Sequence, residues 1–266
     1  MIQSERVAAF RALHESGCFV IPNPWDVGTA VALEQFGFPA LATTSSGHAA
    51  TFGRLDQHVS RDELLAHAEA VAAAVPVPLN VDAEGCFAAD PGGVPRTVEL
   101  IGQTGAAGCS LEDYDPAAQA ILPIDVATER VASAVDAARA SGLVLTARAE
   151  NHLYGQPDLD DTIARLQAYA AAGAGVVYAP GLARLEDIGR VVAAVDCPVN
   201  VLALPRGPSV PELASVDVRR ISTGGLLARA AYGALVTAAT ELRDAGTSTY
   251  STRAISSADV AAAFGR

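Results

Sequence analysis

The feature that most constrains the fold is an alternation along the whole chain: eight short apolar runs are separated by longer, alanine-rich amphipathic stretches. Continuously apolar runs of this length are typical of parallel strands that are covered on both faces by helices. We therefore predict strands at residues 18–22, 40–44, 78–82, 108–112, 143–147, 175–179, 198–203 and 220–223.

Helical patterns lie between these runs, at residues 5–16, 26–36, 60–75, 93–105, 125–141, 158–172, 184–195 and 225–244, with a short, weak crossover near 209–215. Ser60 and Glu63 have the spacing of a helix capping box. Eight strand–helix units in about 250 residues predict a (β/α)₈ TIM-type barrel, and a doubly wound open sheet is the alternative. We expect one catalytic barrel domain at 1–245, with 246–266 as its C-terminal extension and a helix at 257–264.

Composition excludes several classes of function. The chain has 30 acidic residues against 18 basic ones, all of them arginine, and a formal net charge of −12, which disfavours nucleic acid and anionic membranes as partners. The absence of lysine excludes Schiff-base chemistry and a P-loop. The 4 cysteines are scattered without a CxxC pair, and no apolar run is long enough to span a membrane. We expect a cytoplasmic protein.

Three carboxylates fall where strands of a barrel end, which is where barrel enzymes carry their functional residues. Asp82 and Glu84 are two residues apart and so face one side, and Glu112 ends the next strand. Acids crowded in one cavity repel each other unless a cation lies between them, and oxygen ligands favour Mg²⁺, with Mn²⁺ as the alternative. The competing interpretation is a set of solvated loop acids. The additional arginine on the following strand favours the metal site.

That arginine is Arg148, which ends a buried apolar run and therefore needs an anionic partner. The partner is either a substrate carboxylate or, in a structural ion pair, Glu150 or Glu112. His152 follows the same strand and is a candidate for proton transfer.

Four hydroxyl residues, Thr43 to Ser46, end the second strand and precede a glycine. Hydroxyl and backbone N–H groups in such a turn can hold a carboxylate or a phosphate, and a helix-capping turn is the alternative. No G-x-S-x-G sequence occurs, so a hydrolase nucleophile is not supported.

In the order and strand placement of its motifs, the chain resembles the isocitrate lyase/phosphoenolpyruvate mutase superfamily over residues 5 to 245. The resemblance is carried by Pro22-Asn23-Pro24-Trp25-Asp26, Thr44-Ser45-Ser46-Gly47, Gly53-Arg54-Leu55-Asp56, Asn80-Val81-Asp82-Ala83-Glu84-Gly85, Leu111-Glu112-Asp113 and Ala147-Arg148-Ala149. It implies a (β/α)₈ barrel whose C-terminal helix is swapped between subunits of a homo-oligomer, a dimer or tetramer. It also implies Mg²⁺ and small 2-oxo or 2-hydroxy acid substrates.

Carried over position by position, the resemblance makes Asp82 the direct metal ligand, with Glu84 and Glu112 holding the ion directly or through water. Glu84 stands where most members have aspartate. The resemblance assigns catalytic roles to Arg148, Asp56 and Glu112. His152 is a further catalytic candidate because it follows the end of a predicted strand. Substrate-binding roles fall on Arg148, Trp25, Thr44, Ser45, Ser46 and Asn200.

The chain departs from the family where lyases carry a Lys-(Lys/Arg)-Cys-Gly-His gating loop. Its counterpart, residues 114–120, is short and lacks lysine, cysteine and histidine. Residues 179–181 also lack the family's acid after strand 6. Our leading hypothesis is a Mg²⁺-dependent C–C lyase, decarboxylase or hydrolase of a small dicarboxylate, acting through an enolate. The alternatives are P–C bond chemistry on phosphonopyruvate and non-catalytic binding of a 2-oxo acid. The proton donor is open among His152, Tyr154, Cys86 and a water.

Overall fold

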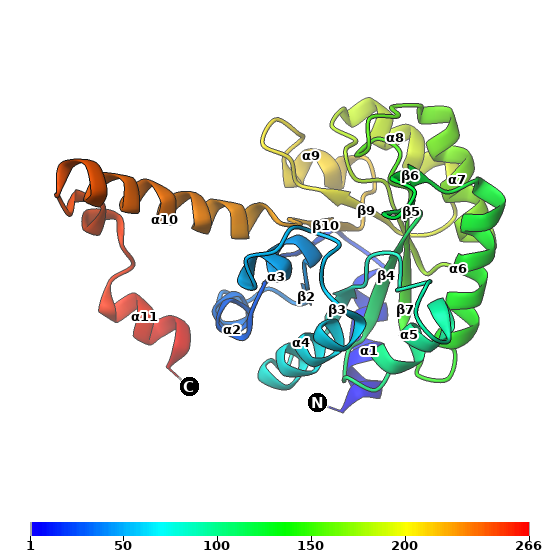
Figure 1. Cartoon of the computed structure of the whole chain (residues 1–266). Coiled ribbons are helices and arrows are strands. Elements are labelled where there is room, and N and C mark those ends of the chain that lie inside the picture. The colour runs from blue at the N-terminus through cyan, green and yellow to red at the C-terminus, as the bar shows by residue number, and fades with distance from the viewer. Residues whose placement is uncertain (1, 266) are drawn as a thin grey trace.

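The computed structural model describes residues 2–265 and confirms the barrel (Figure 1). Eight parallel strands form one sheet in the order β1-β10-β9-β8-β7-β4-β3-β2. Strands that follow each other in this sheet are neighbours, and the last one returns beside the first, whereas a doubly wound sheet starts at its centre and reverses. The strands are β1 (Phe19–Ile21), β2 (Leu41–Ala42), β3 (Leu79–Asp82), β4 (Gly108–Glu112), β7 (Val144–Arg148), β8 (Val176–Tyr178), β9 (Val199–Leu202) and β10 (Arg220–Ser222).

The ring closes between β1 and β2 through the residues that follow β1. The Ala42 N–H donates to the Pro22 carbonyl at 3.1 Å, and the Asn23 side chain donates to the Thr43 carbonyl at 2.7 Å. The oxygen of the same Asn23 side chain accepts from the Thr223 N–H at 2.9 Å. One buried amide therefore ties β1, β2 and the end of β10 together at the mouth of the barrel.

Helices surround the sheet at the predicted places, and local capping explains several of their starts. The Ser60 hydroxyl accepts from the Glu63 N–H, and the Glu63 carboxylate accepts from the Ser60 N–H, so the capping box is confirmed. The helices are α1 (Gln3–Leu13), α2 (Val27–Gln35), α4 (Arg61–Ala74), α5 (Gly93–Ile101), α6 (Ile124–Ala138), α7 (Leu159–Ala171), α8 (Leu185–Ala194), α9 (Val210–Ser215), α10 (Leu226–Ala245) and α11 (Ser257–Phe264).

The sequence patterns missed four short elements. Helix α3 (Ser45–Thr51) begins directly after β2, within the hydroxyl run, with Thr44 as its N-cap. Strands β5 (Tyr114–Asp115) and β6 (Ala120–Ile121) form an antiparallel hairpin after β4, and a 3₁₀ helix, η1 (Thr249–Arg253), follows α10. Each is too short to show a hydrophobic period.

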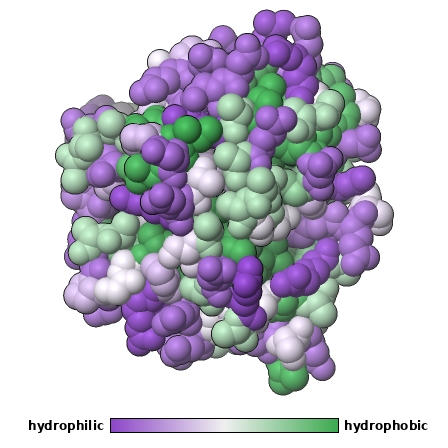
Figure 2. All heavy atoms as spheres, turned by 90° about the vertical axis from the view of Figure 1, so that its right-hand side faces the viewer, coloured by the Kyte–Doolittle hydropathy of each residue, from purple (hydrophilic) through white to green (hydrophobic). Residues whose placement is uncertain are grey.

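The lower, N-terminal end of the barrel is closed by α1. Phe10 on this helix is fully buried, and a Cβ at Gly108 would come within 2.8 Å of its ring, so only glycine fits at the start of β4. The opposite end stays open. On the outer face formed by the helices at the right of Figure 1, hydrophilic residues cover most of the surface and apolar residues form smaller patches (Figure 2).

Helix α10 leaves the barrel as a projecting arm, and α11 turns back to contact α2 (Figure 1). Ala228 is the one buried residue that the structure records on α10, while Leu235 and Val236 are exposed. None of the helices within residues 2–265 combines the length and apolar character that a membrane crossing requires. Met1 and Arg266, the ends of the expected domains, lie outside the described residues.

Candidate active site

A cavity of about 190 Å³ opens at the C-terminal end of the barrel. Of the predicted site residues, its walls include Thr44, Ser45, Ser46, Asp56, Asp82, Glu112, Arg148 and Asn200. A larger hollow of about 550 Å³ lies at the N-terminal end beside α1 and α6, with Leu143, Val144 and Leu145 in its wall. Barrel enzymes do not carry their chemistry at that end. The smaller cavity is therefore the candidate site.

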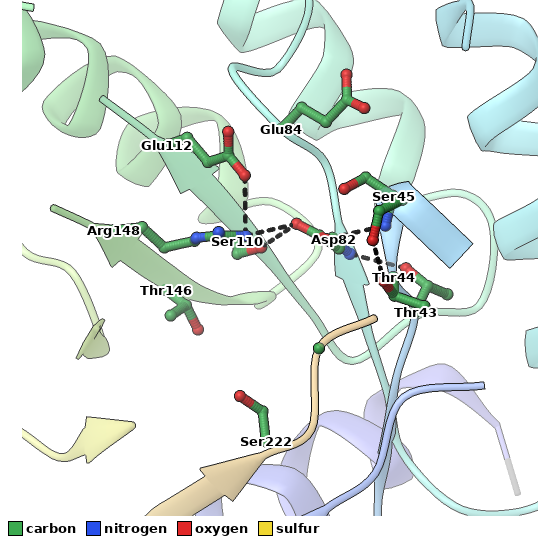
Figure 3. A network of polar contacts seen from close by, with 12 residues as sticks. Thr43, Thr44, Ser45, Asp82, Glu84, Ser110, Glu112, Thr146, Arg148 and Ser222 are labelled. Atoms are coloured by element: carbon green, nitrogen blue, oxygen red, sulfur yellow. Dashed lines mark hydrogen bonds and ion pairs between the residues drawn. The ribbon is translucent and has the colours of Figure 1, made fainter. Parts of the chain in front are cut away.

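Asp82 and Arg148 form the centre of the site (Figure 3). Arg148 Nη1 donates to Asp82 Oδ1 at 2.8 Å and lies 3.0 Å from Glu112 Oε1. The Ser110 hydroxyl also donates to Asp82 Oδ1, at 3.2 Å, and the Ser45 N–H donates to Asp82 Oδ2 at 3.0 Å. Adjacent strands thus place their terminal side chains around one carboxylate, as the sequence pattern predicted.

Gln57, in the loop after α3, joins the other two acids. Its backbone N–H donates to Glu84 Oε1 at 3.2 Å, and its side chain donates to Glu112 Oε2 at 3.1 Å. Gln57 and Glu84 both have left-handed backbone conformations, with φ of 64° and 51°. Strain of this kind in non-glycine residues is concentrated at functional sites.

The site places several carboxyl groups around one arginine, and the pKa values of these groups are shifted. Burial raises the pKa of Glu84 to about 8, with Asp82 and Asp56 adding to the shift. Burial also raises the pKa of Glu112, although Arg148 opposes that shift. The guanidinium itself stays charged, because the surrounding carboxylates outweigh its burial and raise its pKa. Asp56 is exposed at the rim, and partial desolvation and Asp82 raise its pKa.

Glu150 is a further acid of the site that we had considered only as a structural partner of Arg148. Its Oε1 accepts from Arg148 Nε at 2.7 Å, while Oε2 is buried and has no hydrogen-bond partner among the described residues. Burial, opposed by Arg148, raises its pKa to about 7. Glu150 follows Arg148 by two residues, just beyond the end of β7, and this spacing, which puts both side chains on the same face of an extended segment, is the sequence signal for this contact.

Arg148 has bonding capacity left for a ligand. A guanidinium carries five N–H groups, and in residues 2–265 the hydrogen bonds and ion pairs of Arg148 involve only Nε and Nη1. Its Nη2 is therefore available to an anion in the cavity. The Tyr178 ring lies 5.2 Å below the guanidinium carbon and fixes its plane.

The acids suit a divalent ion in chemistry, although their side chains are turned to other partners. Within the described part of the chain, no three Asp, Glu, His or Cys side chains are grouped tightly enough to hold one ion. Asp82 and Glu112 contact Arg148, and Glu84 contacts Gln57. Burial is the largest cause of the raised pKa values of Glu84 and Glu112 and favours their protonated forms, and a Mg²⁺ ion bound to these hard oxygen ligands would favour the ionised forms. The carboxylates of Asp82, Glu84 and Glu112 are of the type that binds this ion, but they are not grouped around one point, and the ligand set stays a prediction.

Two other groups of predicted residues line the cavity. Thr44 and Ser46 have hydroxyl oxygens 3.3 Å apart at the start of α3, while the Ser45 N–H is already used by Asp82. Asn200 is buried on β9, and its side chain donates to the Ser222 hydroxyl at 2.9 Å.

Four predicted or considered residues are not part of the cavity wall, and one of them is Glu84, whose carboxylate accepts from the Gln57 N–H. Trp25 packs against Gly47 of α3. A Cβ atom added at Gly47 would lie 2.9 Å from the Cβ atom of Trp25. His152 contacts the backbone turn at Gly181 instead of facing the cavity. The Cys86 thiol is fully buried in the apolar core, and burial raises its pKa.

Tyr154 is the one side chain among the considered proton donors that does line the cavity. Its ring stacks on Tyr114 of the β5–β6 hairpin with a centroid distance of 3.7 Å. Burial and the charges of Glu112 and Glu150 raise its pKa, so its hydroxyl stays protonated at neutral pH.

Comparison with known proteins agrees with this geometry. Residues 10–243 match the family model described as phosphoenolpyruvate phosphomutase. A crystal structure from Burkholderia cenocepacia J2315, named only by class as a lyase/mutase, is 47% identical, with a TM-score of 0.94, over 99% of this chain and 97% of that one. The 2-methylisocitrate lyase of Salmonella typhimurium is 28% identical over 72% of this chain and 68% of its own.

The oxaloacetate decarboxylase of Paraburkholderia xenovorans is likewise 28% identical, over 80% of this chain and 73% of its own length. The family model covers most of the barrel, from α1 into the last turn of α10. It includes every residue of the acid cluster, which consists of Asp56, Asp82, Glu84, Glu112 and Glu150. The chain therefore belongs to the phosphoenolpyruvate phosphomutase family and is an enzyme of the isocitrate lyase/phosphoenolpyruvate mutase superfamily.

Proposed function

We propose that the protein is a Mg²⁺-dependent lyase that breaks a C–C bond next to the carbonyl or hydroxyl carbon of a small 2-oxo or 2-hydroxy dicarboxylate. The observation that carries this proposal is Arg148: its side chain is only 11% exposed and lies among acids, it borders a cavity of about 190 Å³, and its Nη2 has no bonding partner within residues 2–265. A guanidinium with a free edge binds a planar carboxylate well. The relatives named 2-methylisocitrate lyase and oxaloacetate decarboxylase support this class of substrate.

Asp82, Glu84 and Glu112 would hold the ion, with Asp56 at the rim behind them. When bound, a divalent ion supplies a Lewis acid that polarises the oxygens of a 2-oxo acid and offsets developing negative charge. Mn²⁺ has similar ligand preferences and is the expected substitute. The protein's own contribution is to position the substrate and to move one proton.

Arg148 orients the substrate through Nη2 and stabilises the negative charge that grows on oxygen, a contribution that is often the largest in catalysis. For a 2-oxo acid that loses its distal carboxylate, the C–C bond breaks, CO₂ leaves, and the bonding electron pair remains as an enolate. The Tyr154 hydroxyl then gives its proton to the enolate carbon. Solvent returns a proton to the tyrosinate, which balances the cycle.

Phosphonopyruvate chemistry is the second candidate, and the description of the matching family model favours it. The hairpin at 114–121 lacks lysine and asparagine, which weighs against P–C cleavage. Non-catalytic binding of a 2-oxo acid is the third candidate, because the short β5–β6 hairpin offers less cover over the cavity than a full gating loop.

The assembly that we propose is a homo-oligomer, a dimer or tetramer, in which α10 lies against a neighbouring subunit. Its support is the projection of α10 from the barrel with Leu235 and Val236 exposed (Figure 1). Sedimentation of the purified protein tests it, because Leu235→Asp should shift the mass toward that of one chain. A cytoplasmic location stays a prediction.

The test of function is a panel of methylisocitrate, dimethylmalate, oxaloacetate and phosphonopyruvate, incubated with the protein and Mg²⁺ and followed by proton and phosphorus NMR. Turnover of a carbon acid supports the lyase, a change in the phosphorus signal supports the second candidate, and thermal stabilisation without turnover supports binding alone. Tyr154→Phe removes only the hydroxyl, so it should slow product formation while substrate binding persists. If this variant retains full turnover, another group delivers the proton.

A further inference from the structure

One buried arginine of the barrel has no acidic partner. Arg220 begins β10, is 3% exposed, and extends its side chain across the barrel interior. Its Nε donates to Asn200 Oδ1 at 2.9 Å, and its Nη2 donates to Thr146 Oγ1 on β7 at 2.9 Å. Its Nη1 lies 3.5 Å from His14 Nε2, on the helix that closes the lower end.

All three partners are uncharged. His14 Nδ1 lies 2.7 Å from the Phe10 carbonyl oxygen and must donate to it, which leaves Nε2 as an acceptor on a neutral ring. Burial and the nearby Arg220 lower the pKa of His14 to about 4, so this ring stays neutral at physiological pH. Among residues 2–265, Arg220 makes these three hydrogen bonds and no ion pair, so two of its five N–H groups remain unused.

A guanidinium that is removed from water without a counter-charge costs free energy in the folded protein. Burial, together with Arg148, lowers the pKa of Arg220 to about 9, which reflects that cost. An anion that enters the barrel would recover it. Arg220 and Arg148 line the same cavity, so an anionic ligand bound at Arg148 can extend to Arg220.

The two arginines lie at different depths of the cavity. Thr146, which Arg220 contacts, precedes Arg148 by two residues on β7, a step of roughly 7 Å along a strand. Figure 3 shows Thr146 and Ser222 pointing into the space below the Arg148–Asp82 pair. This depth matches two carboxylates that are joined by a short carbon chain.

We propose that Arg220 binds a second anionic group of the substrate, the carboxylate that the reaction does not remove, at the floor of the cavity. This inference rests on the proposed function and adds a rule of specificity to it. The reacting end of the acid, with any carboxylate that leaves as CO₂, lies at Arg148, and the retained carboxylate pairs with Arg220 beside Asn200 and Ser222. A monocarboxylate with the same reacting end leaves Arg220 unpaired, so the enzyme selects dicarboxylates.

Calorimetric binding in Mg²⁺ tests this with ligands that differ mainly in the second carboxylate: malate and 2-hydroxyglutarate against lactate. The parent protein should prefer the better-fitting dicarboxylate over lactate, and R220Q should weaken the dicarboxylate by about 30-fold or more while lactate changes little. R219Q is the matched control, because it removes the same charge from the preceding residue. Arg219 lies outside the cavity and donates to the Gly17 carbonyl at 3.2 Å.

Two further readouts keep the inference open to refutation. N200D supplies Arg220 with an internal carboxylate and should abolish the preference for dicarboxylates with Arg220 still present. R220Q should melt at the same temperature as the parent or higher, because it removes an unpaired buried charge. If R220Q melts lower and weakens lactate and malate equally, Arg220 is structural and the inference is wrong. If malate, 2-hydroxyglutarate and lactate all fail to bind the parent protein, the proposed function itself is overturned.

Discussion

Two other arginines with little exposure, Arg165 and Arg148, lie next to carboxylates, and they differ in how completely the hydrogen-bonding groups of their neighbours are satisfied. Arg165 on α7 donates to Asp161 at 2.8 Å and to Asp113 at 3.2 Å. Asp113 also accepts from the Tyr169 hydroxyl at 2.6 Å and from the Glu150 N–H at 2.8 Å, so both of its oxygens are bonded. No residue around Arg165 in this network belongs to the wall of the active-site cavity, apart from Glu150.

Arg148 shows the opposite balance. It faces Asp82, Glu112 and Glu150 at once, has no partner for Nη2 in the part of the chain that the structure describes, and borders the cavity. One oxygen of Glu150 has no partner, although the backbone of the same residue belongs to the satisfied Asp113 network. The comparison teaches that a closed set of partners marks a contact that holds the fold. Acids with shifted pKa values and open bonding positions mark a site that can bind ligands.

The largest expected difference concerns turnover. Arg148→Gln should lower kcat/KM by about 10³-fold, because the growing negative charge on the substrate loses its fixed positive partner. The measurement is steady-state kinetics on the substrate that the NMR panel identifies. Arg165→Gln is the matched control and should keep its turnover per folded molecule. Equal losses in the two variants would erase the distinction between the clusters.

The next effect concerns stability. Asp113→Ala should lower the free energy of unfolding by about 3–5 kcal/mol, because it leaves the buried Arg165 with the partly exposed Asp161 as its acidic partner and breaks the Tyr169 and Glu150 hydrogen bonds. Urea unfolding followed by circular dichroism measures this. A change below about 1 kcal/mol would show that the Arg165 network does not hold the fold.

The pH dependence of the metal-free protein should separate the clusters further. Glu84 has its pKa raised to about 8, so the folded state holds a proton that the unfolded state has lost above its ordinary value of 4.5. Stability contributed by this group is present at low pH and is lost as the pH rises toward 8. With EDTA, the free energy of unfolding should fall by about 2 kcal/mol from pH 6 to pH 8.

Two controls accompany this pH experiment. Glu84→Gln should flatten the slope, because the amide does not titrate, and added Mg²⁺ should restore stability at pH 8 by neutralising the acids. A slope that is unchanged in Glu84→Gln would assign the effect to another group, such as Glu150, whose pKa is raised to about 7.

The smallest effect is expected from the hairpin. Tyr114→Ala removes the ring that stacks on Tyr154 and should lower kcat by about fivefold, since such a contact contributes about 1 kcal/mol. Tyr114→Phe keeps the ring and should behave like the parent enzyme. If both variants match the parent, Tyr154 is positioned by other contacts.

The sequence was sufficient for the barrel because its strands are buried on both faces and therefore read as continuous apolar runs. It also placed Asp82, Glu112 and Arg148 together, since parallel strands bring their ends to one mouth. Helix α3 escaped prediction because Ser, Thr and Gly are weak helix formers, and its position depends on the Thr44 cap.

Other parts of the site could not be predicted, because they depend on contacts between distant segments. Gln57 contacts Glu84 and Glu112 only after the loop beyond α3 folds over the mouth of the barrel. Arg220 sits in an ordinary strand pattern, and only the structure shows that its neighbours are all neutral. Trp25 and His152 lie near strand ends, yet neighbouring turns direct them away from the cavity.

The most direct test of the acid cluster is a titration of the metal-free protein with Mn²⁺, followed by electron paramagnetic resonance and by competition with Mg²⁺. We expect one competed ion per chain, lost in Asp82→Asn and retained in Asp90→Asn, which changes an acid that pairs with Arg61 outside the cavity. Equal binding by the Asp82 variant and the parent, or no binding by the parent, would contradict a metal site at the carboxyl ends of β3 and β4.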